Sequence, residues 1–287
     1  MVEAVLSYLW AATLASLIQI GVFLVPGLVL ALIMNYQSEF VVRHALLTMG
    51  YRPYLVLFGW LGTIVHELGH VIFCIIFRHK IISMKLFSPD RETGILGYVE
   101  QTYDSKSVYQ LIGNFFIGVG PIILGTAIIC LLSYLLLGLD PFVLADKFNM
   151  ASSYIPSWGA LLQIFQILWT SSTSMLFELF SWHNLSSWQL YLFIYLAFAI
   201  GSSITLSPSD IKASLKGSGV ILILILIFNL ATLWAGDLVS DIITGTIGYF
   251  RVFYIAMFLI LLLNIAVSVL ILLPLSLLRA RHSSFRY

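Results

Sequence analysis

The sequence predicts an all-α fold, a polytopic transmembrane helical bundle of about six spans with a small β-hairpin after the second span. Of the 287 residues, 60% are hydrophobic and only 9% are charged, whereas soluble domains carry about 25% charged residues. The mean hydropathy is +1.02, and apolar stretches long enough to cross a bilayer recur along the chain. We therefore expect one integral-membrane domain over residues 1–287, embedded in the lipid bilayer.

Net charge and cysteine content argue against two other classes of protein. The net charge of +1 gives no electrostatic basis for binding nucleic acid, so no such partner is expected. Both cysteines, Cys74 and Cys130, lie in apolar stretches. We expect them to be buried small hydrophobic side chains rather than a disulfide or a metal site.

Six stretches are predicted to span the membrane. The first is overlong and is interrupted by Gly21, Pro26 and Gly27, so we expect a kinked or tilted helix. The third is interrupted near Pro121. The predicted spans are residues 5–34, 54–77, 108–137, 188–206, 220–234 and 252–273.

Residues 158–180 form a further apolar stretch, but one that is rich in Gln, Ser and Thr. It is either a re-entrant or surface helix or a seventh span. The positive-inside rule favours the former, because six crossings put the basic loops after spans two and four on the same side as the basic C-terminal tail. That side is then cytoplasmic, so both termini are predicted to be cytoplasmic in a multi-pass protein of a prokaryotic cell membrane. Four basic residues fall on the opposite side.

Residues 81–101 are the non-helical stretch of note. Residues 81–87 alternate partly as a strand does, residues 88–90 and 93–94 carry turn signals, and residues 97–100 can form a return strand. We predict a small β-hairpin on the cytoplasmic side, with an irregular loop as the alternative.

The second span carries a candidate metal site, the segment HELGH at residues 66–70. On a helix, His66 and His70 lie about 40° apart around the axis and about 6 Å apart along it, so both imidazoles can reach one metal ion. Glu67 lies on the flank of that face, where it can hold or deprotonate a metal-bound water. Ionisable groups are costly inside a membrane, at about 3 kcal/mol for each charged side chain, and usually mark a function.

A catalytic metal site needs a third protein ligand, and Asp210 is the best candidate. It follows the fourth predicted span, at the membrane depth of the two histidines, beside a proline that can turn the carboxylate inward. The alternative is an ordinary aspartate that caps the next helix. Weaker candidates lie on the opposite side or in the hairpin loop, and they are Glu178, His183, Asp90, Glu92, Glu100 and Asp104.

With these motifs the chain resembles the site-2 protease family of intramembrane zinc metalloproteases. HELGH at 66–70 matches the first family motif in full, and SPSD at 207–210 is similar to the second, although it lacks the usual Asn and the Gly after Asp. The likeness covers residues 54–216, which we take as the core of the domain. Flanking helices over 1–53 and 217–287 lie outside it. It implies one Zn²⁺ per chain, with Asp210 as the third ligand, and a strand after the motif that helps to hold the substrate. Iron and cobalt also suit such ligands.

The expected activity is hydrolysis of a peptide bond in a membrane-anchored protein near the cytoplasmic face, with Glu67 as the catalytic base. The candidate substrate-binding residues are Gly97 and Tyr98, which could pair with an extended substrate, and Asn114. Asn114 is either an oxyanion donor or a partner in an interhelical hydrogen bond. The glycines before Pro121 serve either a lateral gate or close helix packing. A metal-ion transporter and a catalytically silent scaffold remain alternative functions.

Overall fold

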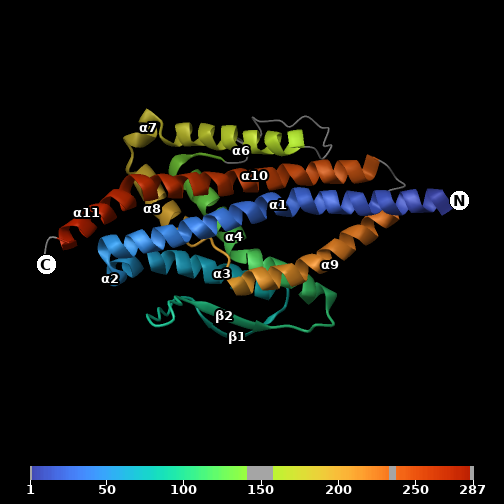
Figure 1. The fold of residues 1–287 in the computed structure, drawn as a ribbon, viewed down its shortest axis with the longest axis horizontal. Coiled ribbons are helices and arrows are strands. Elements are labelled where there is room, and N and C mark those ends of the chain that lie inside the picture. The colour runs from blue at the N-terminus through green and yellow to red at the C-terminus, as the bar shows by residue number, and fades with distance from the viewer. Residues whose placement is uncertain (1, 141–157, 233–236, 285–287) are drawn as a thin grey trace.

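The computed structural model describes residues 2–140, 158–232 and 237–284. The molecule is elongated, with its longest helices running along the long axis (Figure 1). Among the described residues, five helical segments are long and apolar enough to cross a membrane: Val2–Met49, Tyr51–Ile76, Val108–Leu137, Pro208–Thr232 and Val252–Arg279. The predicted transmembrane helical bundle is therefore confirmed.

The helices follow the predicted order with some changed boundaries. The second segment comprises a short helix α2 (Tyr51–Tyr54), a π-helical turn η1 (Leu55–Gly59) and α3 (Trp60–Ile76). After α4 (Val108–Leu137) come α6 (Trp158–Leu179), α7 (Trp182–Leu185), α8 (Trp188–Gly201) and α9 (Pro208–Thr232). The chain then forms α10 (Asp237–Val267), a second π-helical turn η3 (Ser268–Leu272) and α11 (Leu273–Ser284). The apolar stretch at 158–180 that is rich in Gln, Ser and Thr forms α6, which packs along α10 (Figure 1).

Three predicted boundaries were wrong. The first helix, α1, runs unbroken from Val2 to Met49 instead of ending near residue 34, because loss of hydropathy does not end a helix; it ends at Gly50, whose φ is +85°. The fourth predicted span stops at Gly201, and the fifth begins at Pro208 rather than at residue 220. Proline at the first position of a helix is a start signal that a hydropathy profile does not detect.

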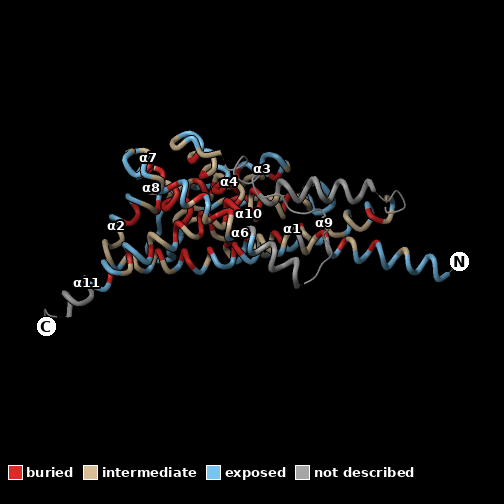
Figure 2. Tube along the Cα trace, turned by 90° about the horizontal axis from the view of Figure 1, so that it is seen from above, coloured by how far each residue is buried: buried red, intermediate tan, exposed pale blue. Residues whose placement is uncertain are grey.

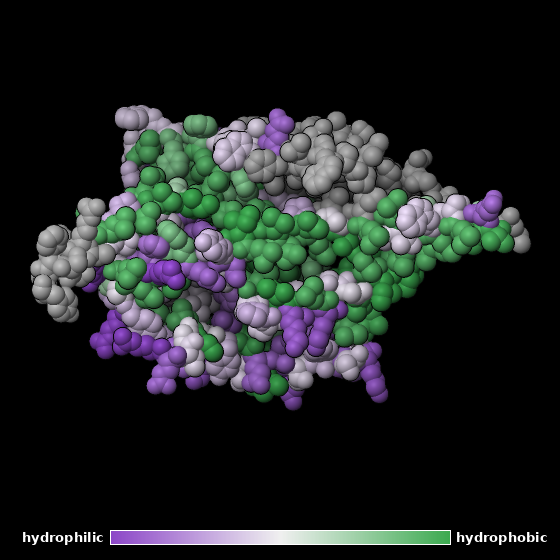
Figure 3. Space-filling model, viewed as in Figure 1, coloured by the Kyte–Doolittle hydropathy of each residue, from purple (hydrophilic) through white to green (hydrophobic). Residues whose placement is uncertain are grey.

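The predicted hairpin is confirmed. Strand β1 (Lys80–Lys85) pairs antiparallel with β2 (Tyr98–Thr102), with one irregularity between Ile81 and Ser83. Figure 3 shows hydrophilic side chains gathered along this edge of the molecule and apolar side chains over the long helices.

Both ends of the hairpin are fixed to the helices. Near the tip, Phe87 and Leu96 pack against an apolar cluster formed by α1, α2 and η1. The Arg91 guanidinium lies 5.6 Å from the centre of the Tyr51 ring. At the base, the buried His79 contacts the Gln101 side chain and the Gln110 carbonyl. The exposed Asp90 carboxyl accepts hydrogen bonds from the Glu92 N–H and the Thr93 hydroxyl, which lower its pKa.

The core is built by buried residues of α1, α3, α4, α6, α8 and α10 and is the buried region of Figure 2, whereas the N-terminal end of α1 projects beyond it. Glycines allow the closest contacts. A Cβ on Gly69 of α3 would lie 2.6 Å from the Pro121 nitrogen of α4, and one on Gly217 of α9 would lie 2.3 Å from the Phe115 nitrogen of α4. On α4 itself, a Cβ on Gly120 would lie 2.6 Å from the Gly69 carbonyl oxygen, and one on Gly118 would lie 2.5 Å from the Asp210 carbonyl oxygen. These contacts favour the close-packing role predicted for the glycines of α4.

A buried polar cluster joins α1 to α9. The Asn229 amide donates to Ser16 Oγ (2.8 Å) and to Gln19 Oε1 (3.1 Å), and Gln19 Nε2 donates to Asn229 Oδ1 (3.3 Å). All three side chains are buried. Because these polar groups have no water to bind at this depth, they depend on partners inside the protein, and the Asn229 and Gln19 amides find theirs on the facing helix.

We expect Asn229→Leu to lower the free energy of unfolding by about 1–3 kcal/mol, because it leaves the buried Gln19 amide without its partner. Thermal unfolding in detergent measures the loss. The double variant Gln19→Leu/Asn229→Leu should recover most of it, since both polar partners are then replaced. A single variant as stable as the parent protein would contradict this account of the cluster.

Candidate metal centre

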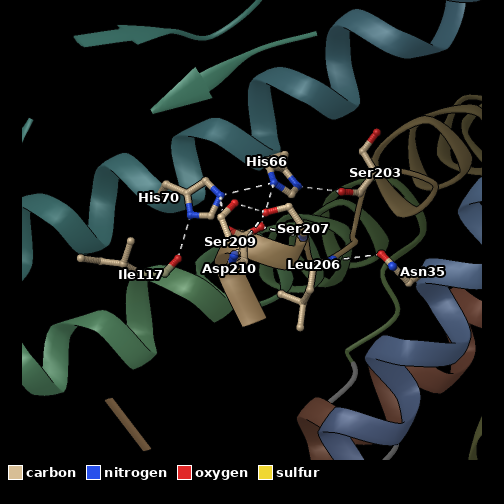
Figure 4. Close-up of polar contacts among 9 residues, drawn as sticks. All are labelled: Asn35, His66, His70, Ile117, Ser203, Leu206, Ser207, Ser209 and Asp210. Carbon is tan, nitrogen blue, oxygen red and sulfur yellow. Dashed lines mark hydrogen bonds and ion pairs between the residues drawn. The ribbon is translucent and has the colours of Figure 1, made fainter. Parts of the chain in front are cut away.

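The side chains of His66 and His70 point from one face of α3 towards Asp210 on α9 (Figure 4). The two Nε2 atoms lie 3.3 Å apart, and His70 Nε2 lies 3.4 Å from Asp210 Oδ1. His66 Nε2 lies 3.9 Å from Asp210 Oδ2. Among the described residues these three form a group whose ligand atoms all lie within 4.8 Å of one another. The structure thus brings together the three residues that the sequence nominated as ligands.

Each imidazole is oriented by a backbone carbonyl behind it. His66 Nδ1 lies 3.0 Å from the Ser203 carbonyl oxygen, and His70 Nδ1 lies 2.8 Å from that of Ile117. A carbonyl oxygen only accepts, so each Nδ1 carries the proton and donates it. Both Nε2 atoms are then left with lone pairs that face the centre of the group, which is the tautomer a metal ligand requires.

The Ile117 carbonyl is available to His70 because of Pro121. In a regular helix the carbonyl of residue 117 accepts from the N–H of residue 121. Pro121 lies inside α4 and has no N–H, so this carbonyl lacks its usual donor in its own helix. At membrane depth it needs another donor, and the His70 ring supplies it.

The carboxylate of Asp210 caps a helix and also faces the imidazoles of His66 and His70. Asp210 Oδ2 accepts from the Ser207 N–H (2.8 Å), and Ser207 Oγ accepts from the Asp210 N–H (3.2 Å). This reciprocal pair is a capping box at the start of α9. It fixes the rotamer of Asp210 and leaves Oδ1 directed at His70. Asp210 therefore belongs to the first turn of α9, a helix that was predicted to begin only at residue 220.

Glycine allows α9 to approach closely enough for this contact. A Cβ on Gly118 of α4 would lie 2.5 Å from the Asp210 carbonyl oxygen and 2.2 Å from Ser214 Oγ. Any larger residue at position 118 would therefore move the first turn of α9 away from α4. The position of Asp210 thus depends on the absence of a side chain on the neighbouring helix.

The donor set fits a divalent metal ion. Two lone-pair nitrogens that face each other at 3.3 Å repel each other unless a cation lies between them. Tetrahedral zinc with Zn–N bonds of about 2.0–2.1 Å places neighbouring ligand atoms about 3.3 Å apart. The separations of 3.3 and 3.4 Å match this value, and the third, at 3.9 Å, is wider. Two histidines and a carboxylate are also a known ligand set of catalytic zinc, which leaves a fourth position open.

Glu67 lies beside the hairpin. Its side chain is 7% exposed, and a Cβ on Gly97 would lie 2.9 Å from Glu67 Cγ. The same Cβ would meet the Lys85 and Leu86 carbonyl oxygens, each at 2.9 Å. The residue before β2 must therefore be glycine for the hairpin to lie this close to Glu67. Of the predicted substrate-binding residues, Gly97 is the one placed against the predicted base.

The other two predicted substrate-binding residues, Tyr98 and Asn114, have different surroundings from Gly97. Tyr98 is 40% exposed and pairs in register with Lys85. Asn114 is buried, and its amide donates to the Gln110 carbonyl of its own helix (3.5 Å), so the predicted interhelical bond is replaced by one within α4. Asn229 does form such an interhelical bond. The weaker ligand candidates stay apart from the centre, since Glu178 and His183 are exposed and Glu100 accepts from Ser83 Oγ.

Sequence reasoning missed the residues that orient the ligands. The Ser203 and Ile117 contacts are made by backbone atoms, which leave no residue signature of their own. One signal was present in the sequence, because Pro121 lies four residues after Ile117 and so releases that carbonyl.

Comparison of the chain with protein-family models, with curated proteins and with solved structures found no match.

Pro121→Ala should weaken metal binding about 10-fold, as loss of a supporting hydrogen bond to a metal-bound histidine does. The new N–H at position 121 would compete for the Ile117 carbonyl and draw it away from His70. Zinc affinity, measured by competition with a chelator, tests this expectation. Pro26→Ala, which changes the proline inside α1, is the matched control, and equal affinities in both variants would contradict the role of Pro121.

Proposed function

We propose that this protein is an intramembrane zinc metalloprotease that hydrolyses a peptide bond of a membrane-anchored protein, as its resemblance to the site-2 protease family implies. The observation that carries the proposal is the convergence of His66, His70 and Asp210 within a bundle of apolar helices, with Glu67 in the same turn of α3. Ionisable groups gathered at membrane depth mark a functional site.

Zinc is the metal that we propose, because its catalytic sites combine two histidines with a carboxylate. Held by these ligands, it would supply a Lewis acid with one open position for water or for a substrate carbonyl. The chain's own residues prepare that chemistry. The Ser203 and Ile117 carbonyls fix the imidazoles, and the capping box fixes the carboxylate, so little rearrangement is needed on binding.

Glu67 is the proposed general base and acid. It would accept a proton from the attacking water and then transfer it to the nitrogen of the leaving amine. Its place against Gly97 puts the hairpin backbone beside the same carboxylate. A substrate helix must unwind to expose its scissile carbonyl, and an extended segment could then pair with a strand of the hairpin by β-augmentation.

The alternative functions receive less support. A transporter would need a series of ligand groups along a path. Among residues 2–140, 158–232 and 237–284, one group of three His, Cys, Asp or Glu ligands lies within metal-binding distance. A silent scaffold would have no need for a buried carboxylate at position 67.

The first test is metal content. We expect about one zinc per chain in the purified, zinc-loaded protein and little in His66→Ala or His70→Ala, because two ligands alone do not hold catalytic zinc. Asp210→Asn should also lose zinc, although its amide oxygen can still accept the Ser207 N–H and preserve the start of α9. His183→Ala, at an exposed site on α7, is the control. Full zinc content in Asp210→Asn would remove Asp210 from the ligand set.

The second test is cleavage. The protein is reconstituted into liposomes with a mixture of membrane proteins, and new N-termini are identified by chemical labelling and mass spectrometry. Glu67→Gln should reduce cleavage by about 10²–10⁴, the usual contribution of general acid–base catalysis, while zinc content is retained. Glu178→Gln, at an exposed carboxylate on α6, should cleave as the parent protein does. Undiminished cleavage by Glu67→Gln would refute the mechanism.

A further inference from the structure

We propose that Asn35 and Ser38 of α1 are positioning residues for the metal centre, because they fix the loop at residues 202–207 that orients both His66 and Asp210. The inference rests on the proposed metal site but assigns a role to a helix that contributes no ligand to it.

The side chains of Asn35 and Ser38 both form hydrogen bonds with the backbone of the loop. Asn35 Oδ1 accepts from the Leu206 N–H at 3.1 Å (Figure 4), and Ser38 Oγ donates to the Ser202 carbonyl. Residues three apart lie on one face of a helix. A single face of α1 therefore makes hydrogen bonds to both ends of the loop. Leu206 and Ser202 are themselves buried.

The same loop carries the groups that orient the ligands. The Ser203 carbonyl accepts from His66 Nδ1, and Ser207 forms the capping box with Asp210. On the opposite side the loop is wedged against α3, since a Cβ on Gly62 would lie 2.0 Å from Ser203 Oγ. The loop is therefore clamped between α1 and the helix that bears both histidines.

Asn35 supplies the one hydrogen-bond acceptor that the loop needs from another part of the chain. The N–H groups of residues 202 to 205 bond to carbonyl oxygens of residues 198, 200, 201 and 203, and the Ser207 N–H bonds to Asp210. Only the Leu206 N–H, of the six in the loop, is satisfied from a distant element, and that partner is Asn35. A buried N–H without a partner would be costly, so loss of Asn35 should let the loop rearrange beside Ser207 and Asp210.

The test compares variants of α1 in the full-length protein. Asn35→Leu removes the acceptor and keeps the number and branching of the non-hydrogen side-chain atoms, and Asn35→Asp retains Oδ1. Gln37→Leu is the matched control, because Gln37 is buried on the same helix but donates to Ser268 Oγ, away from the loop. Ser38→Ala and Ser38→Thr form a second pair in which the hydroxyl is removed or kept.

Two readouts separate positioning from general stability. We expect Asn35→Leu to weaken zinc binding about 10-fold and to change the visible spectrum of the Co²⁺-substituted protein, and Asn35→Asp to restore both. Gln37→Leu should leave the affinity and the spectrum unchanged even if it lowers the unfolding temperature. In the metal-free protein, hydrogen–deuterium exchange of the peptide containing residues 202–210 should be faster in Asn35→Leu than in Gln37→Leu.

Parental affinity and spectrum in Asn35→Leu, or no rescue by Asn35→Asp, would overturn the proposal. If the parent protein bound no metal, the proposed function would fail on that result alone. Exchange in the metal-free protein would then decide the positioning role. Faster exchange in Asn35→Leu that is confined to residues 202–210 supports the positioning role of Asn35, and unchanged exchange refutes it.

Discussion

The rest of the structure depends on one constraint, that polar groups at membrane depth must find their partners inside the protein. The residues of the candidate metal centre show it most clearly. Each histidine donates Nδ1–H to a carbonyl, and the carbonyl of Ile117 is free to accept because Pro121 cannot donate to it. The interior thus selects one tautomer for both imidazoles and turns their lone pairs to a common point.

Close approach of the helices is the second condition for the site. The three candidate ligands come from two helices, α3 and α9, that both pack on α4, where glycines replace side chains at the contacts. Gly69 lets α3 touch Pro121, and Gly118 lets the first turn of α9 touch α4. In a membrane, where hydrophobic burial does not drive helices together, such small residues supply the packing. The absence of side chains at Gly69 and Gly118 therefore lets the helices that form the site come together.

The hairpin and the helix α1 bring further parts of the chain to the centre. The hairpin is fixed at both ends and its backbone lies against Glu67 at Gly97. From the opposite side, α1 holds the loop that precedes Asp210. The predicted flanking helix is thus in direct contact with the loop that orients the ligands.

The class of fold and the candidate ligands could be predicted from the chain, because hydropathy and the spacing of His66 and His70 are local properties. Asp210 was predicted from its membrane depth and the neighbouring proline. Three features emerge from the folded molecule alone: Asp210 caps α9 while it faces His70, Ser203 and Ile117 orient the imidazoles, and Asn35 bonds to the loop. These contacts join residues far apart in the chain, and several are made by backbone atoms. Backbone atoms are the same in every residue, so no sequence pattern distinguishes the carbonyls that the fold selects.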